Sequence, residues 1–186
     1  MRKTETARSF PGLRVLVPVC CISALCAAPV FSQDFVAKEY KNSIGLGAGG
    51  GISLENDAPN ISITGQYTRE LNDDWSVSVS LAYDKEFRRK NGRTTESQEY
   101  SLQATLGYEL SDEWSVVGGF ARGIIEKDEG KDWEAAGSRN WSVGVGIAYS
   151  IPVNERVSMG PSLVTAYSFE NTEVRMELEW EVSYAF

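Results

Sequence analysis

Histidine and cysteine are the most informative absences in this 186-residue chain. It contains no histidine, and its three cysteines, Cys20, Cys21 and Cys26, all lie near the amino terminus. The rest of the chain therefore has no thiol for a disulfide or a metal, and it lacks the commonest general base and metal ligand. We expect no cofactor, no metal site and no catalytic site in this protein.

A long uncharged hydrophobic run occurs only at the amino terminus. Arg2, Lys3, Arg8 and Arg14 precede residues 15–31, which carry no charge and are rich in Leu, Val, Ile, Cys and Ala. This pattern is typical of a secretory signal peptide, and we predict a leader over residues 1–32, with cleavage before Gln33. The alternative is an uncleaved inner-membrane anchor, because the run approaches the ~20 residues that span a bilayer.

Basic residues are scarce beyond the predicted leader. Residues 33–186 contain 14 basic and 25 acidic residues, which gives a net charge of −11. Nucleic-acid-binding proteins present basic surfaces to phosphates, so this balance argues against nucleic acid as a partner.

Residues 33–186 show neither a helical period nor a run of spanning length, but they alternate with period 2. In the clearest segment, 75–83, Trp75 and the next four odd-numbered residues are bulky and apolar, whereas the even-numbered residues are Ser or Ala. Such alternation predicts strands with two different faces. We predict eight strands, at 43–54, 61–70, 75–84, 98–110, 114–124, 139–151, 157–168 and 173–186.

The faces of these strands decide between a soluble and a membrane barrel. A soluble barrel of the lipocalin kind needs charged residues on its outer face, but the non-apolar faces here carry mostly Ser, Thr, Gly, Ala and Gln. Aromatic residues also cluster near strand ends, as in the girdles of outer-membrane barrels. The sequence therefore predicts an all-β fold over residues 33–186: an eight-stranded antiparallel up-and-down transmembrane β-barrel whose apolar side chains face lipid.

The last predicted strand carries the most specific motif. Hydrophobic residues alternate without a break through Trp180, Val182 and Tyr184 to Phe186. This segment resembles the carboxyl-terminal signal of outer-membrane barrels, and the chain resembles small barrels of the OmpA/OmpX type. The resemblance implies residence in the bacterial outer membrane and recognition by the barrel-assembly machinery through Trp180, Val182, Tyr184 and Phe186.

The inward face of the same strand carries a possible charge ladder in the lumen, formed by Arg175, Glu177, Glu179 and Glu181. Closure of the barrel would place these residues opposite the glycines of the first strand, where there is space. The ladder could bind a cation or share protons. The alternative, which we favour, is a hydrated polar plug that satisfies buried groups.

A single basic cluster follows the third predicted strand, in the connection 85–97. At the outer rim, Arg88, Arg89, Lys90 and Arg93 could contact lipopolysaccharide phosphates, and Arg122 could reach the same headgroups from the lipid-facing wall. The alternative is a loop tip that its charges keep solvated. Outer-membrane lipids, lipopolysaccharide included, are thus the predicted partners.

Three functions remain open on the sequence alone. The first is a non-enzymatic barrel with a role in envelope integrity or surface interaction through its loops. The second is a narrow channel for small or apolar solutes. The third is a lipid A-modifying enzyme, against which the absence of histidine argues.

Overall fold

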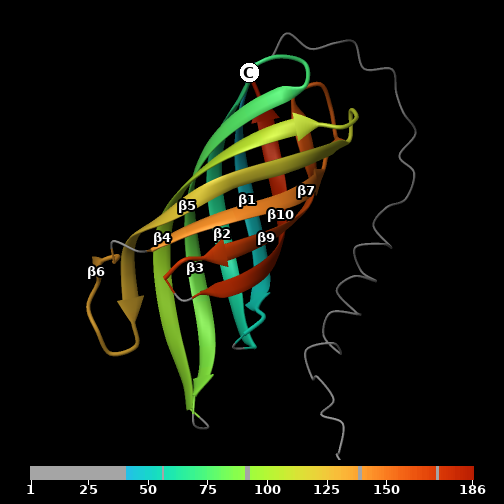
Figure 1. Ribbon diagram of the computed structural model, residues 1–186. Coiled ribbons are helices and arrows are strands. Elements are labelled where there is room, and N and C mark those ends of the chain that lie inside the picture. Colours follow the sequence, from blue (N-terminus) through green and yellow to red (C-terminus); the bar gives the residue numbers. More distant parts are fainter. Residues whose placement is uncertain (1–40, 56, 91–92, 138–139, 171) are drawn as a thin grey trace, which may run out of the picture. The chain divides into compact units, whose positions relative to one another are not determined.

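The computed structural model describes residues 41–186 except 56, 91–92, 138–139 and 171, and of residues 89, 90 and 93 it describes only the backbone. The predicted leader, 1–32, lies outside the described residues. Ten strands follow one another along the chain (Figure 1): β1 (Asn42–Ser53), β2 (Ala58–Glu70), β3 (Trp75–Lys90), β4 (Arg93–Glu109), β5 (Trp114–Asp128), β6 (Glu134–Ala135), β7 (Trp141–Tyr149), β8 (Ile151–Pro152), β9 (Val157–Ser168) and β10 (Glu173–Ala185). In this part of the chain no helix is long and apolar enough to cross a membrane.

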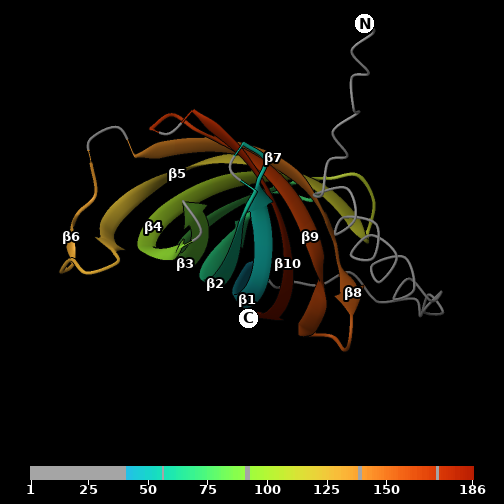
Figure 2. The same ribbon diagram turned by 90° about the horizontal axis from the view of Figure 1, so that it is seen from below.

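The strands form one closed antiparallel barrel. Each long strand pairs with its neighbours in chain order, and β10 pairs both with β9 and with β1, which closes the wall (Figure 2). The two-residue strands β6 and β8 pair with β5 and β9. β8 continues the path of β7 after Ser150, and β6 lies off the main path of the sheet. The wall therefore consists of eight long strands, as the alternation predicted.

The barrel is apolar on the outside and polar on the inside. Leu46, Ile63 and Val145 are 72%, 61% and 60% exposed, whereas Ala58 and Ala82 are the only buried hydrophobic residues among those described. Buried polar residues outnumber them and include Ser62, Thr64 and Ser80. A water-soluble protein would reverse this arrangement, so the exposed apolar wall requires a lipid environment.

Aromatic rings pair near both ends of the strands, as predicted. One girdle contains the pairs Trp75–Tyr108 and Trp114–Tyr149, both with ring centroids 4.8 Å apart. The other contains Tyr83–Tyr100 at 5.1 Å and Tyr167–Phe169 at 5.3 Å. Trp133, which the sequence did not assign to a girdle, packs on Tyr100 at 5.4 Å.

Three tight turns share one design at the rim that also holds Phe186, which we call the short-turn rim. In each turn a polar side chain accepts hydrogen bonds from two backbone N–H groups two and three residues later. The acceptors are Asn72, Ser111 and Asn154. Such Asx and Ser turns close the chain compactly, which fixes the register of the strands that follow.

The opposite rim, which we call the hairpin rim, differs from the prediction. The predicted connection 85–97 is strand except for residues 91–92, which lie outside the described residues: β3 and β4 continue pairing to Lys90↔Arg93. The resulting hairpin projects beyond the other strands (Figure 1). The basic cluster therefore lies on this hairpin and not in an open loop. The reason is that the alternation of faces continues past Asp84, with charged residues in place of serines.

Candidate functional site

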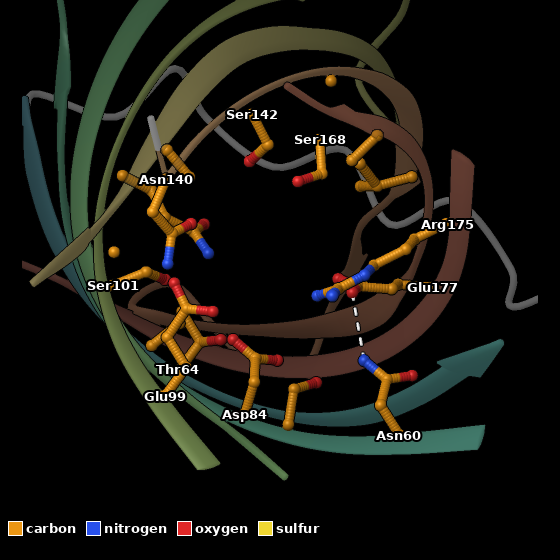
Figure 3. A pocket seen from close by; sticks show the side chains of 18 of the residues that line it. Asn60, Thr64, Asp84, Glu99, Ser101, Asn140, Ser142, Ser168, Arg175 and Glu177 are labelled. Carbon is orange, nitrogen blue, oxygen red and sulfur yellow. Dashed lines mark hydrogen bonds between the residues drawn. The ribbon is translucent and has the colours of Figure 1, made fainter. Parts of the chain in front are cut away.

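A cavity of about 380 Å³ occupies the lumen of the barrel (Figure 3). Its lining runs from Asp128 and Glu170, at the hairpin rim, to Thr64 and Glu179, about midway along their strands, and on β4 and β5 it continues to Thr105 and Val117. The walls consist chiefly of the small polar residues that alternate inward on every strand, such as Ser62, Ser101 and Ser142. Because those side chains are small, the lumen is hollow along this lining.

Acidic groups dominate the charge of this cavity. Eight carboxylates line it, against the two guanidinium groups of Arg88 and Arg175. The carboxylates belong to Asp84, Glu86, Glu99, Glu126, Asp128, Glu170, Glu177 and Glu179. The negative potential of such a cavity attracts cations and repels anions. Within the described residues, however, no group of three acidic side chains is arranged to hold a metal ion.

Two buried glutamates and two partly exposed arginines form an ion-pair network at the cavity wall. Glu86 accepts hydrogen bonds from Arg88 Nε at 2.5 Å and from Arg175 Nη2 at 2.9 Å. Glu173 Oε2 lies 3.8 Å from Arg175 Nη2 and 3.9 Å from Arg88 Nη2. Only 8% of the Glu86 side chain and 6% of the Glu173 side chain are exposed. The network ties β3 to β10 across the intervening strands β1 and β2.

Toward the short-turn rim, hydrogen bonds between inward side chains run along the lumen wall and join neighbouring strands, or strands separated by one other strand. Gln66 Nε2 donates to Glu181 Oε1 at 2.5 Å, and Ser80 Oγ donates to Gln103 at 3.3 Å. Hydroxyl pairs follow at Thr68–Ser78 and Ser158–Ser183, both at 2.7 Å. None of Gln66, Thr68, Ser158 or Glu181 lines the cavity. We call this layer the floor.

The predicted charge ladder faces the lumen, and its members bond to different partners. Arg175 pairs with Glu86, Glu177 accepts from Asn60 Nδ2 at 3.1 Å, and Glu181 accepts from Gln66. Register places Glu177, Glu179 and Glu181 opposite Gly51, Gly49 and Gly47. A Cβ on Gly47 would collide with the Glu179 carboxylate, so the glycines provide the space predicted. Whether the ladder binds a cation stays a prediction.

The predicted lipopolysaccharide contacts are divided between the two faces. Arg88 points into the lumen and pairs with Glu86, and its contact with lipopolysaccharide at the outer rim stays a prediction. Arg122 faces outward, as predicted, and its Cζ lies 5.1 Å from the centre of the Trp141 ring. The side chains of Arg89, Lys90 and Arg93 lie outside the described residues.

The carboxyl-terminal motif continues the outer wall. Trp180, Val182 and Tyr184 are 40%, 45% and 41% exposed on β10, and Phe186 N–H donates to the Asn42 carbonyl at 2.8 Å. Recognition of these residues by the assembly machinery stays a prediction.

Several lumen residues were missed at the sequence level. Asp84, Glu86 and Glu173 lie beyond or at the ends of the predicted strands. Their inward position could have been predicted from the alternation alone. Asp84, Glu86 and Arg88 are even-numbered, as are the inward residues of β3 before them.

A titrating pair lies at the hairpin rim, outside the membrane-spanning wall. Lys131 Nζ donates to Asp128 Oδ2 at 2.8 Å, which lowers the pKa of Asp128 below its usual value. Both side chains are more than half exposed, so solvent weakens this interaction.

Comparison with protein families matches residues 42–185 to one described as "Putative MetA-pathway of phenol degradation". The chain belongs to this family. No curated protein sequence matches it.

Among solved structures, the barrel is similar to three small outer-membrane proteins. Ail, the attachment invasion locus protein of Yersinia pestis, is 18% identical with a TM-score of 0.54, covering 80% of this chain and 100% of that one. Neisserial surface protein A is 15% identical with a TM-score of 0.59, covering 78% and 96%. OprG from Pseudomonas aeruginosa is 11% identical with a TM-score of 0.51, covering 82% and 99%.

The fold and these neighbours identify a small β-barrel protein of the bacterial outer membrane. Such barrels have short turns on the periplasmic side and longer connections outside. By this rule we expect the short-turn rim on the periplasmic side and the hairpin rim, where the cavity opens, on the extracellular side.

Proposed function

We propose that this protein is a non-conducting outer-membrane barrel that acts at the cell surface through its extracellular half. The observation that carries the proposal is the floor: the cavity lining includes none of Gln66, Thr68, Ser158 and Glu181, whose inward side chains are tied to the wall by hydrogen bonds nearer the short-turn rim. An eight-stranded barrel is just wide enough for side chains to fill. We therefore expect the side chains of the floor, Gln66 and Glu181 among them, to obstruct a solute in this lumen.

The extracellular half is built as a stable platform. The Glu86 network joins β3 to β10 inside the barrel. The β3–β4 hairpin continues from Glu86 and Arg88 to the end of the strand pairing. Charge complementarity favours a partner that presents cationic groups to the acidic cavity. The names of two neighbours, an attachment protein and a surface protein, support a role at the cell surface.

Enzymatic activity is not part of the proposal. The chain has no histidine, and the described residues include no metal-binding group of acidic side chains. Lipid A modification accordingly ranks below the other two functions.

The family description raises the question of phenol passage, which would make the protein a channel for an aromatic solute. The cavity does not favour it, because a neutral aromatic ring gains little from walls of serine and carboxyl groups. The acidic lining favours cations instead, so a channel with this lumen would be cation-selective.

Conductance across planar bilayers tests the proposal. We expect the purified wild-type barrel to show no steps above the bare membrane. The double variant Gln66→Ala, Glu181→Ala removes one hydrogen-bonded pair of the floor, with its two long side chains, and should open a cation-selective conductance. Leu46→Ala, an outward substitution on β1, is the matched control and should stay silent. Stepwise conductance, or uptake of phenol into liposomes, by the wild type would contradict the proposal.

A further inference from the structure

Two cationic side chains lie on the outer wall of β5, each over an indole ring. Arg122 Cζ is 5.1 Å from the centre of the Trp141 ring, and Lys127 Nζ is 5.9 Å from that of Trp133. Cations are attracted to the faces of aromatic rings, and Trp is the most favourable partner. Each contact therefore holds a positive charge at a defined place on the wall.

A β-bulge places both cations on the same face. Residues five apart on a regular strand point to opposite faces. The pairing of β4 with β5 shifts between Tyr100↔Ile125 and Ser101↔Gly123, which leaves Ile124 as an extra residue. Lys127 consequently pairs with outward Gln98, while Glu126 turns to the lumen. Without the bulge a carboxylate would replace the lysine on the outer wall.

No carboxylate forms an ion pair with either cation among the residues that the structure describes. Other basic side chains nearby are engaged: Lys85 pairs with Glu96 at 2.7 Å, Lys131 pairs with Asp128, and Arg88 pairs with Glu86. Arg122 and Lys127 are thus available to an external anion.

The surroundings of these cations place them at the outer leaflet. Arg122 pairs with Leu102 and lies beside Phe120 and Trp141 on the exposed apolar wall. Lys127 lies further along, beyond the girdle residue Tyr100. A charged residue on the lipid-facing side of a barrel is destabilising unless it reaches the interface or a counter-charge. The long arginine side chain can extend toward the headgroups, where Lys127 lies.

We propose that Arg122 and Lys127 form a docking site for the phosphate groups of lipopolysaccharide on the outer wall of β5. Lipopolysaccharide is the lipid of the outer leaflet and carries phosphates in its headgroup, which arginine and lysine recognise through charge-assisted hydrogen bonds. Trp133, Trp141 and Tyr100 offer amphipathic rings at the same level. The inference depends on the outer-membrane location and not on whether the lumen conducts.

Native mass spectrometry of the detergent-purified barrel with defined rough lipopolysaccharide tests the site. We expect Arg122→Gln, Lys127→Gln to weaken lipid binding by roughly tenfold for each cation lost. Lys131→Gln, which removes a charge from the extracellular loop and not from the wall, should bind like the wild type. Heat-modifiable migration in detergent gels establishes that each variant is folded, and Arg122→Lys should retain most binding if the double variant does not fold.

Three outcomes would overturn the proposal. The first is equal lipopolysaccharide binding by the folded double variant and the wild type. The second is undiminished wild-type binding after the lipid phosphates are removed. The third is equal affinity of the wild type for phosphatidylglycerol, which would identify a general anionic-lipid surface.

Discussion

Replacing Glu86 with glutamine tests how the extracellular half of the barrel is held together. The network of Glu86, Glu173, Arg88 and Arg175 is neutral, and the substitution leaves a net positive charge in it. Removing one partner of a buried ion pair costs about 3–5 kcal/mol. We expect about 3 kcal/mol, at the low end, because Arg88 is 38% exposed and Glu173 stays near both guanidinium groups.

The matched control is Glu96→Gln on the same hairpin. Glu96 pairs with Lys85 at 2.7 Å on the outer wall with 43% of its side chain exposed, so its loss should cost at most about 1 kcal/mol. Both costs can be measured as free energies of unfolding in urea, with the barrel in lipid vesicles and tryptophan fluorescence as the probe. Equal costs for the two substitutions would refute the view that the buried network stabilises this half of the barrel.

Three further predictions concern the wall and the rims. Gly160→Ala should destabilise the barrel by about 1–3 kcal/mol in the same urea assay, because the added Cβ would collide with the Tyr149 carbonyl group. Gly65→Ala is the control and should be nearly neutral, because its Cβ would meet nothing closer than Leu46 Cδ2 at 3.8 Å. Asn72→Ala should cost about 1 kcal/mol in that assay, because two turn N–H groups lose their acceptor, and an unchanged free energy of unfolding would contradict this role. The folded-state pKa of Asp128 is lowered, so the stabilisation from its bond to Lys131 is present at neutral pH and is lost as pH falls through that pKa. Carboxyl NMR should show Asp128 titrating below a free aspartate, and Lys131→Gln should raise the pKa of Asp128 toward the free value, whereas an unchanged pKa would contradict this pairing.

Much of the barrel could be predicted because its faces follow a strict period of two. The alternation after Trp75 predicted a strand, and the same pattern elsewhere predicted the other long strands. Their predicted ends agree with the structure to within a few residues, except at the β3–β4 hairpin. One face of each strand carries small polar residues, and the other carries bulky apolar residues. The small polar face lacks the charges that the outside of a soluble barrel needs, so the apolar face could be predicted to contact lipid.

The extended hairpin could not be predicted in the same way. Charged residues from Asp84 onward suggested a loop, because carboxylates are rarely buried without a partner. Besides the nearby Arg88, Glu86 is paired with Arg175, which lies 89 residues further along the chain and reaches it only after the barrel closes. Such a contact leaves no local pattern in the sequence.

The bulge at Ile124 is a second feature without a local signal. One extra residue exchanges the inward and outward faces of everything after it on β5. Strict alternation carried onward from Arg122 would have assigned Glu126 to the lipid and Lys127 to the lumen, which is the reverse of what the structure shows.

Nitroxide scanning along β3 tests the central claim most directly, which is that the apolar side chains face lipid and the small polar ones face the lumen. Single cysteines introduced at residues 76–83 of the barrel, in lipid vesicles, would each carry a spin label. We predict high accessibility to oxygen at the odd-numbered positions, such as Val79 and Leu81, and low accessibility at Ser80 and Ala82. The opposite phase, or no alternation, would contradict the account.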